Sequence, residues 1–450
     1  MNDITAFFAF LRYCLGYKGD MSRVVTGMDW QELYSFASKQ ALQGLCFEGI
    51  ERLGKEYPEE LKRNPIGREL LMTWMGKAQQ IRRQNRKVNT VASKLFSMLR
   101  EDGLRCCVLK GQGNALMYPN PYSRTPGDID VWIDASRERI MEYAQNKFEL
   151  EDDIRLQHLE TSLDGVPIEL HFFPCSMNNP IYHARLQKWF RRNADLQCSH
   201  IVGLPDGAGD IAIPTTAFNV IYQLTHLYHH FFDEGIGMRQ IIDYFLVVND
   251  FSKNVFLNND LSNPSVSLSK GSSTSHPSPL SSEERDVTAL RCSEPLRSRD
   301  GGASKPSPNC AGWDRLAIEG DNSAGSTTVV TSSASTALDV VQRELKYLGL
   351  WKFSGAVMYV LHEALGLPEE KMIAPMDEKR GKLLLAEILN GGNFGRHFTK
   401  YGGFTHQSMG KKYFLKIWRN MHFVRFFPAE ALSEPIFRTW HFFWRMKYKK

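Results

Sequence analysis

Apolar residues recur at helical spacing through the first hundred residues of the chain. Positions three and four apart lie on one face of a helix, so such stripes predict helices that bury one side. Two stripes are clear: Ile4, Phe7, Phe8 and Leu11, then Val88, Val91, Leu95 and Leu99. Residues 1–100 are therefore predicted to form a helical N-terminal region. Glu101, Asp102 and Gly103 are expected to end its last helix and turn the chain.

The pattern becomes strand-like after Leu104. The run RCCVLK predicts a short buried strand, and residues 129–133 predict a second one. Ser136 is a good N-cap for a helix over residues 139–147. Alternating segments at 155–163 and 166–173 flank Asp164-Gly165, a dipeptide typical of β-hairpin turns. Residues 101–178 thus predict a small mixed β-sheet with helices.

Helical periodicity returns after Pro180 and again from Leu338. Between these parts, about one residue in five of the segment 252–337 is serine, and aromatic residues are almost missing. Such a segment cannot bury enough apolar surface to offset the entropy lost on ordering. We predict that it is a disordered insertion within one helical domain, whose two parts are residues 179–251 and 338–450. The expected fold class is α+β, a small mixed sheet flanked by N- and C-terminal helical regions.

Composition narrows the picture only slightly. A chain of 450 residues is too long for one compact core and suggests two or three domains. The formal net charge of +5 favours anionic ligands, but it is too small and too little patterned to indicate a nucleic-acid binder by charge alone. The eight cysteines contain no C-x-x-C pair, which fits reduced thiols.

The N-terminus does not resemble a secretion signal, because Asp3 and Arg12 stand where such a signal needs positive charge and an unbroken apolar run. No apolar run reaches the roughly 18 residues of a spanning helix. We therefore expect a cytoplasmic protein with no transmembrane segment.

The most informative chemistry is the sequence Gly127-Asp128-Ile129-Asp130. Residues two apart on a strand share a face, so both carboxylates are expected to point the same way. Two carboxylates on one face suit hard cations such as Mg²⁺. Gly127 has no side chain and would let a ligand approach closely. A D-x-D triplet on its own is more often a solvated strand face, so the neighbouring residues decide its interpretation.

Three nearby features favour a site for a phosphorylated ligand. Lys110 and Gly111 end the first strand, and a helix starting there would direct its free N–H groups at an anion. Lys110 adds a charge suited to phosphate. Arg124 precedes Asp128 by four residues and could reach a phosphate with two hydrogen bonds, although a surface salt bridge is the plainer interpretation.

A third carboxylate is expected from the second strand of the hairpin. In Val166–His171, Glu169 and His171 share one face, and the apolar residues take the other. Our hypothesis is that Glu169 lies beside Asp128 and Asp130, where it could ligate metal or act as a general base. The alternative is an edge strand with Glu169 in solvent.

Two pairs spaced four apart lie on the later helices. His226 and His230 share a helical face, but without an H-E-x-x-H pattern they are interpreted as core or surface histidines. Arg239 and Asp243 could form an intrahelical ion pair. Alternatively, Arg239 could reach the nucleotide or the acceptor from the helical domain.

Taken together, these residues resemble a known family. The run KG…L-Y-P…R…GDID, followed downstream by IELH, is similar to the uncharacterised bacterial nucleotidyltransferase family of the DNA polymerase β-like nucleotidyltransferase superfamily. The resemblance implies that Gly111 matches the turn before the acidic strand. It also implies that Asp128 and Asp130 are the metal pair and that Glu169 is the third carboxylate. Lys-Gly replaces the usual Gly-Gly or Gly-Ser turn.

The expected function is metal-dependent transfer of a nucleoside monophosphate from a nucleoside triphosphate, with release of pyrophosphate. The cofactor would be Mg²⁺ or Mn²⁺, and the acceptor could be protein, RNA, sugar or a small molecule. Nucleotide contacts are expected from Lys110, Gly111, Arg124, Gly127 and Arg239. One alternative is a D-x-D glycosyltransferase, which would need a larger doubly wound sheet. The other is a nucleotide-binding or interaction protein without activity.

Overall fold

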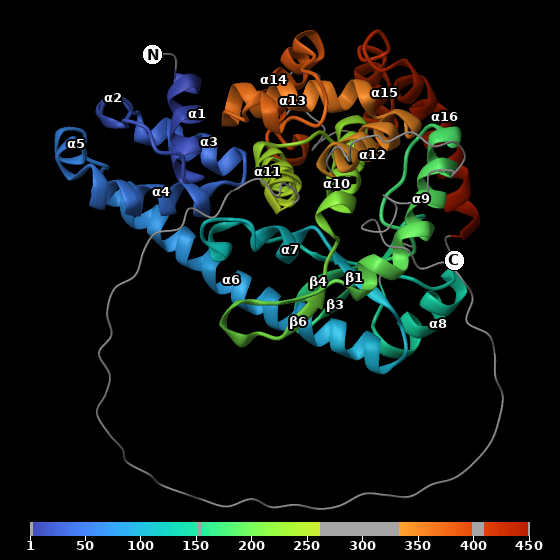
Figure 1. Cartoon of the computed structure of the whole chain (residues 1–450). Helices are drawn as coiled ribbons and strands as arrows, with labels where there is room; N and C mark the ends of the chain where they lie inside the picture. The colour runs from blue at the N-terminus through green and yellow to red at the C-terminus, as the bar shows by residue number, and fades with distance from the viewer. Residues whose placement is uncertain (1–2, 151–154, 262–332, 398–408, 449–450) are drawn as a thin grey trace, which may run out of the picture.

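The computed structural model describes residues 3–150, 155–261, 333–397 and 409–448 (Figure 1). Within these ranges the fold is α+β, as predicted: helices predominate and surround a four-stranded mixed sheet, and a separate two-stranded ribbon lies beside it. Helices come before and after the sheet in the sequence, and in space they enclose it from both sides.

The N-terminal region is helical, as its apolar stripes predict. Its longest helix, α6, ends at Glu101, and Gly103 then adopts a positive φ of 73° that turns the chain into the sheet. The other helices of the region precede it in a compact group at one end of α6 (Figure 1). The elements are α1 (Asp3–Cys14), α2 (Ser22–Thr26), α3 (Trp30–Lys39), α4 (Gln43–Glu56), α5 (Pro58–Arg63) and α6 (Arg68–Glu101).

The sheet has the strand order β1-β2-β4-β3, with β2 and β4 parallel and the other two pairs antiparallel. The β3–β4 turn is Asp164-Gly165, and both residues have positive φ, as a tight hairpin requires. Ser136 caps α8 by accepting a hydrogen bond from the Arg139 backbone N–H. The elements are β1 (Cys106–Leu109), α7 (Gly111–Ala115), η1 (Pro121–Ser123), β2 (Ile129–Ile133), α8 (Arg137–Lys147), β3 (His158–Leu163) and β4 (Val166–His171).

The two faces of this sheet have different partners. Val131 and Ile168 point toward α6 and form a core with its apolar stripe, which includes Leu95. Trp132 points the other way and stacks on Phe218 of α10, with ring centroids 6.2 Å apart. Because side chains alternate along a strand, the polar residues of β2 and β4 share the α10 side with Trp132.

The segment after the sheet is helical except for one short ribbon that the sequence pattern did not predict. Strands β5 and β6 are three residues long, too short for a detectable alternation. The ribbon belongs to the region predicted to be purely helical, and β6 contacts β1 and α6. The elements are α9 (Pro180–Ser199), β5 (Ile201–Gly203), η2 (Pro205–Gly207), β6 (Asp210–Ala212), α10 (Thr216–Asp233) and α11 (Met238–Leu261).

The prediction of disorder over 252–337 is wrong at both ends of that range. Residues 252–261 continue α11, and residues 333–337 begin α12. Both helices therefore extend into the range that the serine-rich composition had marked as disordered. The remainder, 262–332, lies outside the described residues. α11 and α12 contact each other, so the chain enters and leaves this segment from neighbouring helices.

The C-terminal part is helical as predicted. Its helices pack on α10 and α11, away from α6 (Figure 1). Among the described residues, no helix combines the length and the apolar character needed to cross a bilayer. The elements are α12 (Ser333–Tyr347), α13 (Trp351–Leu365), η4 (Glu369–Lys371), α14 (Glu378–Gly391), η5 (Asn393–Gly395), α15 (Met409–Met421) and α16 (Pro428–Tyr448).

Candidate functional site

Asp130 and Glu169 lie side by side on the parallel strands β2 and β4. They are register partners, so both side chains project from the same face of the sheet, toward α10. Asp128 precedes β2 by one residue and is exposed, whereas Asp130 is buried and Glu169 is half-buried. The structure thus places Asp130 and Glu169 on one face, with Asp128 near enough for its charge to interact with both.

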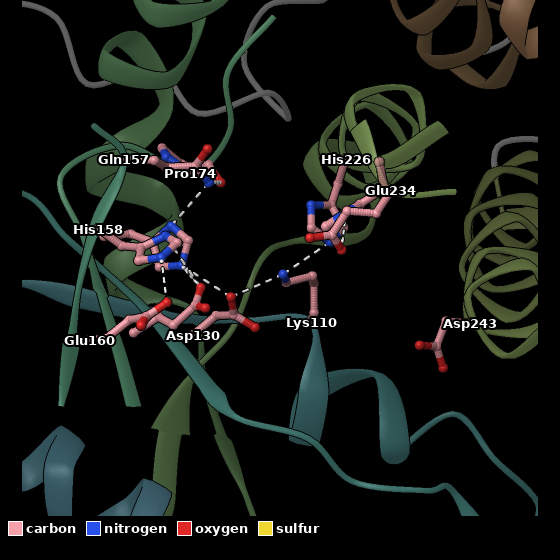
Figure 2. Close-up of polar contacts among 12 residues, drawn as sticks. Lys110, Asp130, Gln157, His158, Glu160, Pro174, His226, Glu234 and Asp243 are labelled. Carbon is pink, nitrogen blue, oxygen red and sulfur yellow. Dashed lines mark hydrogen bonds and ion pairs between the residues drawn. The ribbon is translucent and has the colours of Figure 1, made fainter. Parts of the chain in front are cut away.

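His171 holds two of these carboxylates together. Its Nε2 atom lies 3.0 Å from Asp130 Oδ1 and 3.1 Å from Glu169 Oε2. On the other side of the ring, Gln157 Nε2 lies 3.2 Å from Nδ1 and donates to the Pro174 carbonyl at 3.1 Å. Figure 2 shows this chain of contacts running from Pro174 through Gln157 toward Asp130.

Lys110 lies between the acidic cluster and α10. Its Nζ atom is 3.0 Å from Asp130 Oδ1 and 3.0 Å from His226 Nε2 (Figure 2). Lys110 has a positive φ of 51°, a strained conformation for a residue with a side chain. The lysine expected to contact phosphate is therefore paired with Asp130 in this structure.

The charges in this cluster shift one another's pKa values. Although burial alone would raise it, the neighbouring Lys110 and His171 hold the pKa of Asp130 well below its usual range. Repulsion from Asp130 is the main cause that raises the pKa of Asp128, and partial desolvation is the second. Burial, together with the nearby aspartates, raises the pKa of Glu169 against the effect of its His171 hydrogen bond. Two carboxylates with raised pKa values beside a third that stays ionised are a group that a cation would stabilise.

Arg124 and Asp243 form a buried ion pair that differs from the sequence prediction. Arg124 Nε and Nη2 donate to the two Asp243 oxygens at 2.9 and 2.8 Å, and the Tyr118 hydroxyl donates to Oδ1 at 2.7 Å. The expected intrahelical pair between Arg239 and Asp243 is therefore wrong, because Arg124 reaches the carboxylate with the better two-pronged geometry. Arg239 Nη1 instead donates to the Thr125 carbonyl at 2.9 Å.

A pocket lies between the sheet, α10 and α11. Its lining includes the carboxylates of Asp128 and Asp130 and the cationic side chains of Lys110, Arg124 and Arg239. Three buried donors that line it have no hydrogen-bond partner in the described part of the chain: Arg124 Nη1, Arg239 Nε and Gln240 Nε2. Unpaired buried donors are costly, and an anionic ligand would satisfy them.

The glycine residues fit this arrangement only in part. Gly127 lines the pocket, and a Cβ atom there would meet nothing within 4 Å, so the space beside it is open. Gly111 also lines the pocket, but the helix that it begins, α7, has only five residues. The expected anion site at that N-terminus therefore has a weaker dipole than a full helix would supply.

Comparison with known proteins supports this interpretation of the fold. The family model described as "Uncharacterised nucleotidyltransferase" matches residues 26–262, which include every expected site residue. The chain belongs to this family. The match ends at the last turn of α11, so the helices from α12 onward lie outside it.

Other comparisons add little to the family assignment. A solved structure, the antigenic nucleotidyltransferase-like protein from Paracoccidioides brasiliensis, is 16% identical, with 36% of this chain and 75% of that chain covered. The TM-score is 0.25, so this likeness carries no structural argument. No curated protein matches the chain.

Sequence reasoning missed several residues that complete the site. His226 contacts Lys110, and Gln240 and Phe394 line the pocket. Phe394 lies in η5, outside the matched family region, so no local motif indicated it. His171 had a usable signal, since its spacing of two from Glu169 already placed both on one face.

Proposed function

We propose that this nucleotidyltransferase-family chain transfers a nucleoside monophosphate from a nucleoside triphosphate to an acceptor hydroxyl, with a divalent metal held by Asp128, Asp130 and Glu169. The observation that carries the proposal is the register of β2 and β4, which places Asp130 directly beside Glu169. Asp128 lies two residues before Asp130 in the sequence. The family assignment supports nucleotidyl transfer in general.

The oxygen donors fit Mg²⁺ or Mn²⁺, which prefer carboxylate ligands. Repulsion between Asp128 and Asp130, seen in the raised pKa of Asp128, is what a bound cation would relieve. When bound, such an ion neutralises charge on the triphosphate and aligns the reacting oxygens. Lys110 would then be free to exchange its contact with Asp130 for one with phosphate.

The cationic part of the pocket lining is suited to the triphosphate. Arg124, Arg239 and Gln240 present unpaired buried donors there, and Arg124 is kept in place by Asp243. Guanidinium groups bind phosphate oxygens through paired, charge-assisted hydrogen bonds. In this proposal Arg239 reaches the nucleotide from α11, which is the second interpretation of its sequence position.

In the proposed reaction, the acceptor oxygen forms a bond to the α-phosphorus while the bond to the β-phosphate oxygen breaks. Pyrophosphate leaves with that oxygen, and the acceptor hydroxyl proton passes to a nearby carboxylate. Glu169 suits the base role because its raised pKa brings it closer to the working pH of a general base. The small four-stranded sheet argues against the glycosyltransferase alternative, which needs a larger doubly wound sheet.

The test is a screen of the full chain with nucleoside triphosphates labelled at the α- or γ-phosphate, incubated with fractionated cell extract and Mg²⁺ or Mn²⁺. The α-label should become attached to one fraction while the γ-label appears in pyrophosphate. A folded Asp128→Asn/Asp130→Asn variant should give neither signal, and Asp134→Asn, whose carboxylate pairs with Arg105 beyond the other end of β2, should behave as wild type. Equal pyrophosphate release by the double variant would refute the site, and nucleotide binding without turnover on any acceptor would favour a non-catalytic role.

A further inference from the structure

The β3–β4 hairpin carries a second group of potential metal ligands on the same face as the carboxylates. His158 and His171 are register partners, and Glu160 and Glu169 form the next pair that shares this face. One ligand atom from each of His158, Glu169 and His171 lies within 4.8 Å of the others. The sequence pattern H-x-E on one strand opposite E-x-H on the next therefore converges at one point.

His158 is the unusual member of this group. It is only 8% exposed, yet neither ring nitrogen makes a hydrogen bond with any described residue. The nearest carboxylate oxygens are Glu169 Oε2, 3.4 Å from Nδ1, and Glu160 Oε1, 3.5 Å from Nε2. A buried imidazole without a hydrogen bond is costly unless something occupies its lone pair.

We propose that His158 Nδ1, Glu169 Oε2 and His171 Nε2 bind one divalent borderline metal ion such as Zn²⁺. Two imidazoles and one carboxylate are a set that borderline metals prefer, whereas Mg²⁺ and Mn²⁺ prefer oxygen ligands. The contacts of 3.4 and 3.1 Å from Glu169 Oε2 to the two nitrogens match the spacing of neighbouring ligands around an ion with bonds of about 2.1 Å.

Glu160 and Gln157 would hold the two imidazole ligands in orientation through hydrogen bonds to their other ring nitrogens. Ligation through Nδ1 leaves the His158 Nε2–H directed toward Glu160, a carboxylate–histidine arrangement that orients metal ligands. Ligation of His171 through Nε2 releases the Nε2 proton to solvent and leaves one proton on Nδ1, beside Gln157. The Gln157 amide must then present its oxygen to that N–H in place of its nitrogen.

This site goes beyond the proposed function and does not depend on it. Glu169 is common to both groups, and His171 Nε2 also contacts Asp130, so the ion would sit directly beside the proposed nucleotide site. The ion would take the place of the His171 Nε2 proton that lies between Asp130 and Glu169. It would also add positive charge next to Asp130. Nucleotidyl transfer with Mg²⁺ alone could still occur without it.

The test is zinc binding to the chelator-stripped full chain, measured by titration calorimetry in excess Mg²⁺ so that oxygen-only sites are filled. Wild type should bind one Zn²⁺ ion. His158→Ala should bind at least about tenfold more weakly because it removes a ligand. Gln157→Leu should also bind about tenfold more weakly, because loss of a residue that orients a ligand has an effect of that size. His362→Ala is the matched control, since that half-buried histidine contacts the Leu367 carbonyl in the C-terminal region and should leave affinity unchanged.

Unchanged affinity in His158→Ala would overturn the proposal. A measurement on wild type covers the case in which the variant does not fold. Pulsed EPR of the chain loaded with one equivalent of Cu²⁺ in excess Mg²⁺ should detect imidazole nitrogen couplings, and coupling to no nitrogen would overturn the proposal equally. Failure of the proposed function is distinguishable, because nucleotide transfer is assayed separately with Mg²⁺ and can be lost while zinc binding persists.

Discussion

Asp130 and Glu169 stand directly opposite each other on two parallel strands, and one nitrogen of His171 contacts both. Nearly forty residues separate them in the sequence, so their pairing depends on the sheet. A register shift by one residue would turn Glu169 into the apolar core and separate it from Asp130. The acidic cluster is therefore a property of strand pairing as much as of residue type.

Glu169→Gln should lower kcat by about 100-fold or more while the KM for the nucleotide changes only a few-fold. The amide keeps the size of the side chain and a hydrogen-bonding oxygen, but it cannot take a proton and ligates metal poorly. Steady-state pyrophosphate release over a range of nucleotide concentrations separates the two constants. A rise in KM with unchanged kcat would contradict the role given to Glu169.

Arg239→Gln should raise the KM for the nucleotide about tenfold or more, with a smaller effect on stability. Loss of a charge-assisted contact to phosphate accounts for that size. Burial and the charge of Arg124 already lower the pKa of Arg239, so removal of its charge relieves repulsion. Arg192→Gln, which breaks a pair with Glu344 away from the pocket, is the control. Equal nucleotide affinity in Arg239→Gln and wild type would remove Arg239 from the site.

Asp243→Asn should lower the free energy of unfolding by about 3–5 kcal/mol, because it leaves the buried Arg124 guanidinium without its counter-charge. Urea denaturation measures this loss. The double variant Arg124→Met/Asp243→Leu should recover most of the stability, since apolar residues of similar volume often replace a buried pair without loss. Nucleotide binding by this double variant should nevertheless remain weaker than in wild type, because the Arg124 contact to phosphate is lost. Normal nucleotide binding by the double variant would show that the pair is structural only.

Glu430 should make the stability of the fold depend on pH. Its carboxylate is buried and accepts the Asn178 and Asn179 backbone N–H groups at 2.6 and 3.3 Å. Burial nevertheless raises its pKa to about 7 from an ordinary value of 4.5, so the folded state holds the proton more tightly than the unfolded chain. The stabilisation is complete below the unfolded pKa and is lost as pH rises through about 7.

The measurement compares wild type with Glu430→Gln, which cannot ionise. The unfolding free energy of wild type should fall relative to the variant by up to about 3 kcal/mol between about pH 5 and about pH 8. A difference that stays constant over that range would show that Glu430 is ionised in both states.

Local patterns predicted much of the sheet because they depend on neighbouring residues. The strand at 129–133 and the Asp164-Gly165 turn have the predicted bounds, and Ser136 caps its helix as predicted. Alternation, capping and turn chemistry are encoded within a few residues and survive in any tertiary context. The same local patterns missed the short ribbon β5–β6, which owes its strands to contacts with β1 and α6.

Period-two spacing on one strand was enough to predict that Glu169 and His171 share a face. The fold class and the family resemblance also followed from sequence patterns. The packing of separate elements set which partner each charged side chain meets. Asp243 pairs with Arg124 instead of Arg239, Lys110 bridges Asp130 and His226, and His158 lies across from His171. Residues on one strand or helix are related by a fixed geometric period, whereas partners on different elements depend on how those elements pack, and no local period encodes that.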